Sequence, residues 1–393
     1  MRGTGKPPRY YRDMASAIRV LRVATRLNVG GPTRHISMLM RGMDPSLCAQ
    51  QLVSGPCPAA EGKGVLATPP SAFIVPQLCR EISPWNDWRA LGAMRALAKK
   101  HDPQIIHSHM AKAGLLARLV ARGDSRYRAV HTLHGHTFDS YFRAGSGRVL
   151  AWMESWLALH SAALIVQSPG QRDSVCAHIS KRAAARLHVI PPAVQTEFLE
   201  RPTLRDAALA MSLGVREGVA TVLFPARLVE VKQPLLALAV LEELLKLRRV
   251  LLLVPGDGPL KSKFLARVQQ RGLGAAVKVV PFVAELWRLY DCADATLLLS
   301  RSEGTPLVIL ESHARTVPVA APDVGAVREL LHREDLLLPR ALTPAAIAAS
   351  LHEFLSCRRS GDASAAEARE RVRKENAEAL LCSRVLGLYR SLL

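Results

Sequence analysis

The sequence is poor in aromatic residues, has fewer acidic than basic residues, and contains no long uninterrupted apolar run. Aromatic side chains make up 5% of the 393 residues and do not alternate with basic ones as on RNA-binding surfaces, so nucleic acid is not an expected partner. The longest apolar stretch, residues 235–254, contains five charged side chains, whereas a membrane span needs about 20 apolar residues. Residues 1–14 are basic without an apolar core, so we expect no signal peptide.

Cysteine pairs and acidic metal-binding pairs are also missing. The seven cysteines are scattered and form no Cys-x-x-Cys pair, which argues against a disulfide framework or a thiolate zinc site and is typical of a reducing cytosol. The chain contains no Asp-x-Asp pair, which is consistent with chemistry that needs no metal. We therefore expect a cytoplasmic protein without a metal ion or a cofactor.

The excess of basic residues is concentrated in the first half of the chain. The 53 Lys and Arg against 33 Asp and Glu give a net charge of +20, which predicts a polyanionic or phosphate-rich partner. Residues 1–200 contribute +14 and residues 201–393 contribute +6. The two halves are therefore expected to meet different partners.

Strand signals alternate with helical periodicity along the chain. Apolar runs typical of buried strands occur at residues 18–24, 104–107, 128–133, 162–167, 188–190, 220–224, 250–254, 277–280, 295–299 and 317–320. Helical spacing follows most of them, which is typical of parallel sheets covered by helices on both faces. A polar stretch at 197–217 divides the pattern. We predict two doubly wound α/β domains, residues 1–199 and 200–361, and a helical tail, residues 362–393, that returns to the first domain.

Two carboxylates lie eight residues apart in the second half. Glu303 is in a glycine-containing loop, and Glu311 is on the helix that follows, roughly 9–10 Å away by helical rise. The free N–H groups at the start of that helix suit a phosphate. At this separation, one carboxylate could reach a sugar and the other a second group of the same extended ligand. Taken alone, the pattern is equally consistent with two solvent-exposed glutamates.

Two cations and a glycine turn follow earlier strands of the same domain. Arg227 and Lys232 come after the first strand, where ligands bind in open α/β sheets, and two cations there can neutralise a diphosphate leaving group without a metal. Residues 255–259 form a Pro-Gly-Asp-Gly-Pro turn after the next strand. The alternative is that Arg227 and Lys232 are ordinary surface charges.

In this order, these motifs resemble the donor-binding domain of the family 4 retaining GT-B glycosyltransferases. That family carries an arginine and a lysine after the first strand, a Gly-Asp-Gly-Pro turn and a Glu-x7-Glu motif. The first half resembles it too, in a glycine loop followed by a histidine, an "HxH" strand end and an "HTxHG" segment: Gly30-Gly31 with His35, residues 107–109 and residues 131–135. The resemblance covers residues 18–330 and implies the GT-B fold, two Rossmann-like domains facing a central cleft.

The resemblance also implies the roles of individual residues. The catalytic group would comprise His134, Glu303, Arg227 and Lys232. Glu303 and His134 would contact the donor sugar, Glu311 the nucleotide ribose, and the two cations the diphosphate. The residues expected to bind the donor are Gly30, Gly31, Gly256, Asp257, Gly304, Thr305, Pro306 and Glu311. Five histidines at 107–136 also raise the question of a metal site, but no Asp or Glu lies among them at ligand spacing.

The sequence departs from this family at several glycines. Ala226, Thr316 and Ala326 stand where the family usually has glycine, and residues 191–194 read Pro-Pro-Ala-Val instead of "PNGV". Each added methyl group crowds backbone that the family keeps close to ligand or in unusual φ and ψ. Because the charged residues are intact, we interpret these changes as divergence, and a non-catalytic homologue stays an alternative.

The expected activity is therefore transfer of a hexosyl group from a nucleotide-diphosphate sugar to a glycan or lipid-linked acceptor, in cell-surface polysaccharide or glycolipid synthesis. A nucleotide-sugar 2-epimerase on the same fold is an alternative that the ordered set of motifs disfavours. The basic first half also suits an anionic membrane surface, which would make the protein peripheral at the inner membrane face. The expected contact surface comprises Arg89, Arg95, Lys99, Lys100, Arg118, Arg122, Arg126 and Arg128, with ordinary solvated helix faces as the alternative.

Overall fold

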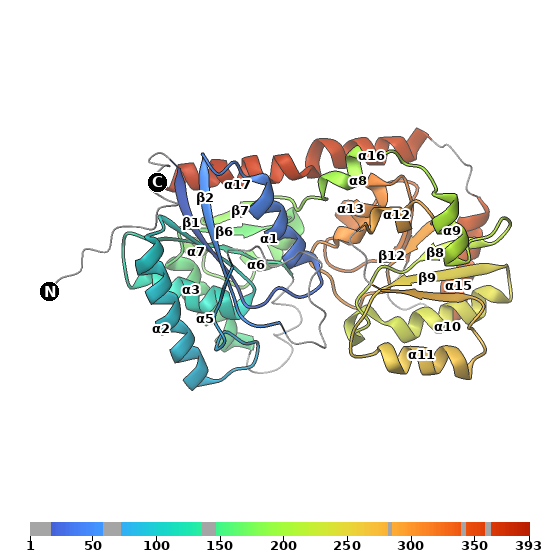
Figure 1. Cartoon of the computed structure of the whole chain (residues 1–393), viewed down its shortest axis with the longest axis horizontal. Coiled ribbons are helices and arrows are strands. Elements are labelled where there is room, and N and C mark those ends of the chain that lie inside the picture. The colour runs from blue at the N-terminus through green and yellow to red at the C-terminus, as the bar shows by residue number, and fades with distance from the viewer. Residues whose placement is uncertain (1–16, 58–71, 136–146, 282–284, 339–342, 358–362) are drawn as a thin grey trace. The chain divides into compact units, whose positions relative to one another are not determined.

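The computed structural model describes residues 17–57, 72–135, 147–281, 285–338, 343–357 and 363–393 (Figure 1). They form two compact units. One holds the described residues up to Pro192 together with Glu378–Leu393, and the other holds Ala193–Ala377. Of the helices in these ranges, none combines the length and the hydropathy that crossing a membrane requires.

The first unit is built on seven parallel strands in the order β3-β2-β1-β4-β5-β6-β7. The strands are β1 (Ile18–Ala24), β2 (Cys48–Ser54), β3 (Phe73–Ile74), β4 (Ile105–His109), β5 (Arg128–Thr132), β6 (Ala163–Val166) and β7 (Leu187–Val189). Its helices are α1 (Gly31–Gly42), α2 (Pro84–His101), α3 (Ala111–Arg122), α5 (Gly147–Leu159), α6 (Pro169–Cys176), α7 (Lys181–Ala184) and α17 (Glu378–Leu392). The strand order reverses between β1 and β4, and ligands of open α/β sheets bind at the carboxyl ends of two such strands.

Alternation of side chains along β1 explains how this sheet is covered. Leu21 and Val23 join the apolar core with α2 and α3, whereas Arg22 lies on the other face, within hydrogen-bond distance of Tyr389 in α17. In the same region α17 packs on α1, and Glu378 pairs with Arg41 at 2.7 Å. One face of the sheet is therefore apolar, and the other carries buried polar groups.

The second unit has six parallel strands in the order β10-β9-β8-β11-β12-β13. The strands are β8 (Ala220–Leu223), β9 (Val250–Pro255), β10 (Val277–Val280), β11 (Ala295–Leu297), β12 (Val319–Pro322) and β13 (Leu336–Leu338). Its helices are α8 (Thr196–Glu200), α9 (Ala207–Leu213), α10 (Pro234–Leu245), α11 (Lys261–Gln270), α12 (Trp287–Tyr290), α13 (Leu307–Ala314), α14 (Val327–Leu330), α15 (Pro344–Ser356) and α16 (Ala363–Asn376). Here the order reverses between β8 and β11.

Both faces of this second sheet are apolar, as its nearly continuous hydrophobic strands require. In β9, Leu252 and Val254 pack toward α10, α11 and α15, while Leu253 packs toward α8, α9, α13 and α16. Figure 1 shows α10, α11 and α15 together on one side of these strands. The two doubly wound sheets confirm the predicted fold class.

The units divide the chain differently from the predicted domains. The predicted boundary at residues 199 and 200 falls inside α8, because Phe198 and Leu199 are buried in the core of the second unit. The tail does not return to the first domain as a whole. Its helix α16 packs on α13 of the second unit, and only α17 packs on α1. The tail passes from the second unit to the first after Ala377, which forms an isolated parallel β-bridge with Val194.

Candidate functional sites

The loops after β8 and β11 bring together the charged residues that the sequence singled out in the second unit. Lys232, in the loop after β8, forms an ion pair with Glu303, in the loop after β11. The two loops are also joined through Gln233, which donates to the carbonyl of Leu299 at 2.7 Å, and by the amide of Arg301, which donates to Val231 at 2.9 Å. A lysine and a carboxylate are thus fixed at the point where the strand order reverses.

The glycine turn after β9 packs against the same region. A Cβ atom at position 256 would lie 2.2 Å from the carbonyl oxygen of Ala226, so only glycine fits there. The amide of Leu228 donates to the carbonyl of Asp257 at 2.9 Å, which places this turn next to the half-buried Arg227. Gly256 therefore allows the close approach of two strand-end loops.

The carboxylate of Asp257 is used within its own turn. It pairs with Lys261 at 2.9 Å and accepts from the amide of Gly258 at 2.7 Å. The hydrogen bond from Lys261, and to a smaller extent that from Gly258, lowers the pKa of this carboxyl below its usual range. The predicted contact of Asp257 with the donor stays a prediction, and the observed contacts stabilise the turn.

The second carboxylate of the pair, Glu311, is deeply buried on α13. Its side chain is 2% exposed and accepts a hydrogen bond of 2.9 Å from the hydroxyl of Tyr290 in α12. Just before the same helix, the buried hydroxyl of Thr305 has no hydrogen-bond partner among the described residues. A buried polar group without a partner is costly, so this hydroxyl is suited to receive a hydrogen bond from a ligand or to donate one.

Ala326 and Thr316, two of the residues that stand where the family usually has glycine, differ in backbone conformation. Gly325, which precedes Ala326, has φ 57°, and a Cβ atom there would lie 2.0 Å from the carbonyl oxygen of Glu303. The neighbouring Ala326 has φ −87°, which any residue adopts, and its amide donates to Gly304 at 3.0 Å. Thr316, in contrast, has φ 57°, a conformation that disfavours a β-branched side chain. The expected crowding is therefore absent at 326, where φ is ordinary, and backbone strain is present at 316.

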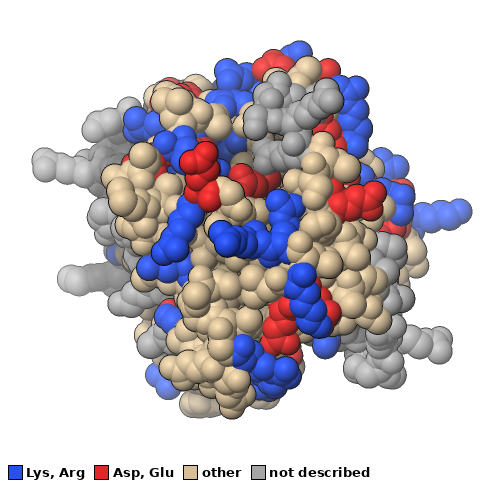
Figure 2. Space-filling model, turned by 90° about the vertical axis from the view of Figure 1, so that its right-hand side faces the viewer, with Lys and Arg blue, Asp and Glu red and all other residues tan. Residues whose placement is uncertain are grey.

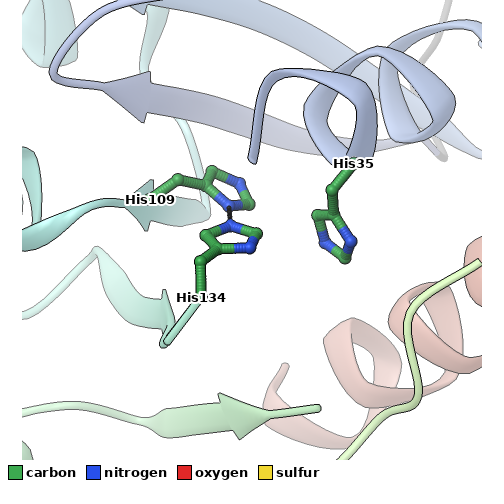
Figure 3. Close-up of side chains that lie close together, drawn as sticks. All are labelled: His35, His109 and His134. Carbon is green, nitrogen blue, oxygen red and sulfur yellow. Dashed lines mark hydrogen bonds between the residues drawn. The ribbon is translucent and has the colours of Figure 1, made fainter. Parts of the chain in front are cut away.

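In the first unit, a group of histidines surrounds a buried arginine at the reversal point between β1 and β4. His107 and His109 lie two residues apart on β4 and therefore on one face, beside Arg22 of β1. Nη1 of Arg22 is 3.0 Å from Nδ1 of His107 and 3.2 Å from Nε2 of His109. Nδ1 of His109 is in turn 2.9 Å from Nε2 of His134, which follows β5 (Figure 3).

The predicted glycine loop lies close to this histidine group. Gly31 is the first residue of α1, and one turn further His35 packs its ring edge-on against His134, with ring centroids 5.0 Å apart. The structure thus brings together the start of α1 and His134, which the sequence placed in one site. His131 points elsewhere, toward Gly114 of α3, and His136 lies outside the described residues.

Burial keeps these histidines neutral. It is the largest cause that lowers the pKa of His35, His109 and His107 well below 6.5, and the neighbouring cation Arg22 acts in the same direction. Burial also lowers the pKa of His134 to about 3. At pH 7 each ring therefore carries a single proton and no charge.

Ring nitrogens of His35, His109 and His134 lie within 4.8 Å of one another, and in the described parts of the chain this is the group that could hold a metal ion. Both nitrogens of His35 are buried and have no hydrogen-bond partner among the described residues. The hydrogen bond from Arg22 opposes a metal here. A metal ion bound to Nδ1 of His109 would require the ring proton to be on Nε2. That nitrogen accepts a hydrogen bond from Arg22, so it carries no proton.

The structure corrects one part of the predicted basic surface. Arg118 is buried, donates to the carbonyl of Gly114 at 2.8 Å and forms an ion pair with Glu154, so it is not available to an outside partner. Arg126 is paired with Asp124 and with Asp102. The cations of α2 stay exposed.

Arg22, Tyr290 and Tyr389 were not predicted from the sequence. Arg22 gave a signal, since it is a charged residue in the middle of an apolar strand and must find partners there. The two tyrosines gave none, because their partners are distant in the sequence.

Comparison with known proteins shows the family. The model described as "Glycosyl transferases group 1" matches residues 208–378, and "Glycosyltransferase Family 4" matches residues 29–198. The Escherichia coli UDP-Gal:alpha-D-GlcNAc-diphosphoundecaprenol alpha-1,3-galactosyltransferase is 28% identical over 268 residues, which cover 67% of this chain and 69% of the relative.

Solved structures support the same fold. Sucrose-phosphate synthase from Thermosynechococcus elongatus matches with a TM-score of 0.78 at 19% identity, over 96% of this chain and 99% of that chain. Anabaena HepE in complex with UDP-glucose matches with a TM-score of 0.74 at 16% identity, over 96% of this chain and 100% of that chain. The two family models together span most of both units, and the chain belongs to the GT4-like glycosyltransferases of the GT-B fold.

Proposed function

We propose that this glycosyltransferase moves a hexosyl group from a nucleotide-diphosphate sugar to a glycan or lipid-linked acceptor, with retention of configuration and without a metal ion. The observation that carries the proposal is the ion pair of Lys232 and Glu303 between the two loops at the reversal point, with the buried Glu311 on the helix that follows. Among solved structures of this fold, HepE is described in complex with UDP-glucose.

In this proposal the second unit holds the donor. Glu311, a buried acceptor, binds the ribose hydroxyls, and Tyr290 holds its carboxylate in place through their 2.9 Å hydrogen bond. Arg227 and Lys232 bind the diphosphate, and Glu303 keeps the Lys232 ammonium directed at it. The start of α13 adds backbone N–H groups for the same negative charge.

The reaction then needs charge stabilisation more than proton transfer by the protein. As the bond between the anomeric carbon and the diphosphate oxygen breaks, its electron pair stays on the diphosphate, where the two cations stabilise it. The acceptor hydroxyl attacks the resulting oxocarbenium-like carbon from the face that the diphosphate leaves. Its proton passes to an oxygen of the departing diphosphate, which is the nearest base on that face. Attack on that face retains the configuration.

The cations take the place that a metal ion has in many enzymes that bind diphosphates. Arg227 and Lys232 provide two positive charges beside the strand ends, and the histidine group in the first unit opposes a metal at His109 through Arg22. We expect full activity in the presence of EDTA. Activity that disappears with EDTA and returns with manganese or magnesium would overturn the metal-free part of the proposal.

The acceptor is proposed from the relatives and from the surface of the first unit. The name of the E. coli relative specifies a diphosphoundecaprenol-linked acceptor. On this chain, Ile82, Trp85 and Trp88 are 91%, 66% and 65% exposed at the start of α2. Exposed tryptophan is typical of surfaces that meet the membrane interface, where a lipid-linked acceptor lies. These observations favour a lipid-linked acceptor.

The decisive experiment measures donor binding and transfer for variants of the proposed donor site. A panel of nucleotide sugars is first screened by thermal shift, because a true donor stabilises the folded protein by mass action. With that donor, Glu311→Ala should raise Kd, whereas Glu303→Ala should lower kcat more than it raises Kd. Equal, small effects of both variants would contradict these roles.

Lys232→Ala and Arg227→Ala should each lower kcat by roughly 10²-fold, because each removes stabilisation of charge that develops in the transition state. Lys246→Ala is the matched control. Lys246 is an exposed lysine of the same unit that is paired with Glu243 at 2.7 Å, and its loss should leave kcat unchanged. Similar kcat values for Lys232→Ala and Lys246→Ala would remove Lys232 from the mechanism.

A further inference from the structure

The buried side chain of Arg22 is the origin of a chain of hydrogen bonds that ends at His134. A guanidinium has five N–H donors and no acceptor. Its Nε and Nη2 donate to the amide oxygen of Gln50, Nη2 also donates to the hydroxyl of Tyr389, and Nη1 donates to His107 and His109. Every N–H group of Arg22 thus has a partner, and the side chain has one orientation.

The direction of each hydrogen bond follows from this donor. Nε2 of His109 receives an N–H from Arg22, so it is an acceptor. A neutral imidazole carries one proton, and the proton of His109 must then be on Nδ1, from which it is donated to Nε2 of His134 over 2.9 Å. His134 is neutral too, so its own proton is on Nδ1.

The hydrogen bonds of His107, the other histidine that accepts from Arg22, are compatible with this assignment. Its Nδ1 accepts from Arg22 at 3.0 Å and from the hydroxyl of Tyr389 at 2.5 Å, so its proton is on Nε2. That nitrogen lies 2.7 Å from the hydroxyl oxygen of Thr132, which is positioned to accept. All the hydrogen bonds around Arg22 agree with one arrangement of protons.

We infer that Arg22 is a positioning residue: through His109 it fixes His134 in the tautomer that carries its proton on Nδ1. His134 then presents a neutral N–H donor on one side, while its other nitrogen is occupied by His109. This inference rests on the proposed function: with a nucleotide sugar as the substrate, the resemblance of residues 131–135 to the family's "HTxHG" segment implies that His134 contacts the donor sugar, and this N–H is the group that would donate to it. The arrangement also prevents His134 from acting as a base, which is consistent with transfer of the acceptor proton to the diphosphate.

The first test reads the tautomer directly and needs no activity. The full chain is labelled with ¹⁵N in its histidines, and the His134 signals are identified by their loss in His134→Asn. We expect a protonated Nδ1 and an unprotonated Nε2 for His134, opposite to the tautomer that free histidine favours in water. A proton on Nε2 of His134 in the unmodified protein would overturn the inference.

A matched pair of variants tests the link through His109. His109→Asn places an amide N–H close to where Nδ1 of His109 lies, so His134 should keep its proton on Nδ1. His109→Leu removes the donor, and the His134 signals should shift toward the tautomer with the proton on Nε2. Identical His134 signals in the Asn and Leu variants would contradict the role of His109.

Kinetics connect the tautomer to the reaction. We expect His109→Leu to lower kcat about 10-fold with little change in the KM of the acceptor, and His109→Asn to recover most of the loss. Equal kcat values for the two variants, with different tautomers at His134, would show that the tautomer has no role in transfer. If no nucleotide sugar is turned over at all, the proposed function fails, while the tautomer measurement still decides the inference.

Discussion

Thr316 is a residue whose conformation conflicts with its side chain. It lies in the turn after α13 with φ 57°, a region in which a Cβ atom crowds the following carbonyl at a cost of roughly 1–2 kcal/mol. Its hydroxyl donates to the carbonyl of Arg315 at 2.7 Å, which offsets part of that cost. The fold holds this strained residue because the buried Arg315 beside it pairs with Asp291 at 2.6 Å.

We predict that Thr316→Gly raises the free energy of unfolding by about 1 kcal/mol, because glycine adopts positive φ without strain. The prediction is checked by thermal unfolding, where the variant should melt at higher temperature. Gly325→Ala, at the same φ and against the carbonyl of Glu303, is the control of opposite sign and should destabilise the protein. A lower melting temperature for Thr316→Gly would show that the lost hydrogen bond outweighs the strain.

Some site residues can be predicted from sequence and others cannot, for a physical reason. Lys232 and Glu303 are charged residues in loops that follow strands, and the carboxyl ends of parallel strands meet at one edge, so their proximity follows from the pattern. The role of Arg22 depends on a neighbouring strand far along the chain. Its hydrogen bonds to His109 are fixed by strand register, which the sequence pattern does not give.

At the scale of elements, the first sheet, the loop after β5 and helix α1 bury five histidines that lie close to one another. The five are His35, His107, His109, His131 and His134, and burial lowers the pKa of each. In the unfolded chain they titrate near 6.5, whereas in the folded protein they stay neutral, down to about pH 3 for His134. Below pH 6.5 the unfolded state therefore binds more protons than the folded state, and stability falls as the pH falls.

We predict that the melting temperature decreases steadily from pH 7 to pH 5.5, a window in which most carboxylates are still ionised. Each buried histidine lowers the free energy of unfolding by at most about 1.4 kcal/mol per pH unit below 6.5. His35→Leu should flatten this dependence, because it removes one of the buried groups that bind a proton on unfolding. In the part of the chain that the structure describes, neither ring nitrogen of His35 has a hydrogen bond that the change would break. His160→Asn, a histidine substitution at an exposed position outside this group, is the matched control. A profile independent of pH would contradict the neutral, buried state of the histidines.

The elements themselves differ in how well the sequence predicts them. Strand β1 has the predicted bounds, because its residues form a short and mostly apolar run that is typical of a buried strand. Strand β2 was missed, since Gln50 and Gln51 interrupt its apolar run although both are buried. Gln50 is buried because it accepts from Arg22 and donates to the carbonyl of Leu39 at 2.7 Å, a pairing between elements that hydropathy does not reveal.

At the scale of the whole molecule, the net charge is +20, and the basic side chains are arranged differently on the two units. On the face shown in Figure 2, basic and acidic side chains are interspersed. In the second unit, cations such as Lys246, Lys261 and Arg271 have acidic partners within 4.0 Å. In the first unit, Arg89, Arg95 and Lys99 are exposed along α2 and continue the face that begins with Trp85 and Trp88. One helix thus presents stacked tryptophans, 5.5 Å apart, followed by cations.

This face of α2 leads to the prediction that the protein binds anionic vesicles at low salt and is released at high salt. The cations are attracted to anionic lipid by about 1 kcal/mol each, an attraction that is screened within about 8–10 Å at physiological salt. The tryptophans prefer the interface between water and lipid, so their fluorescence should shift to the blue on binding. Reversing the charge of Arg89, Arg95 and Lys99 should weaken binding by at least about 10²-fold, by the same energy per charge.

Sedimentation with vesicles of neutral or anionic lipid measures the effect, and binding of the nucleotide sugar shows that each variant is folded. Trp85→Ser with Trp88→Ser should also weaken vesicle binding, whereas Trp152→Ser, at an exposed tryptophan of α5, should not. If charge reversal on α2 has no effect while the unmodified protein still sediments with anionic lipid, another surface makes the contact. Equal sedimentation with neutral and anionic lipid would show that the basic charge plays no part, and the acceptor would then have to reach the enzyme without electrostatic attraction to the membrane.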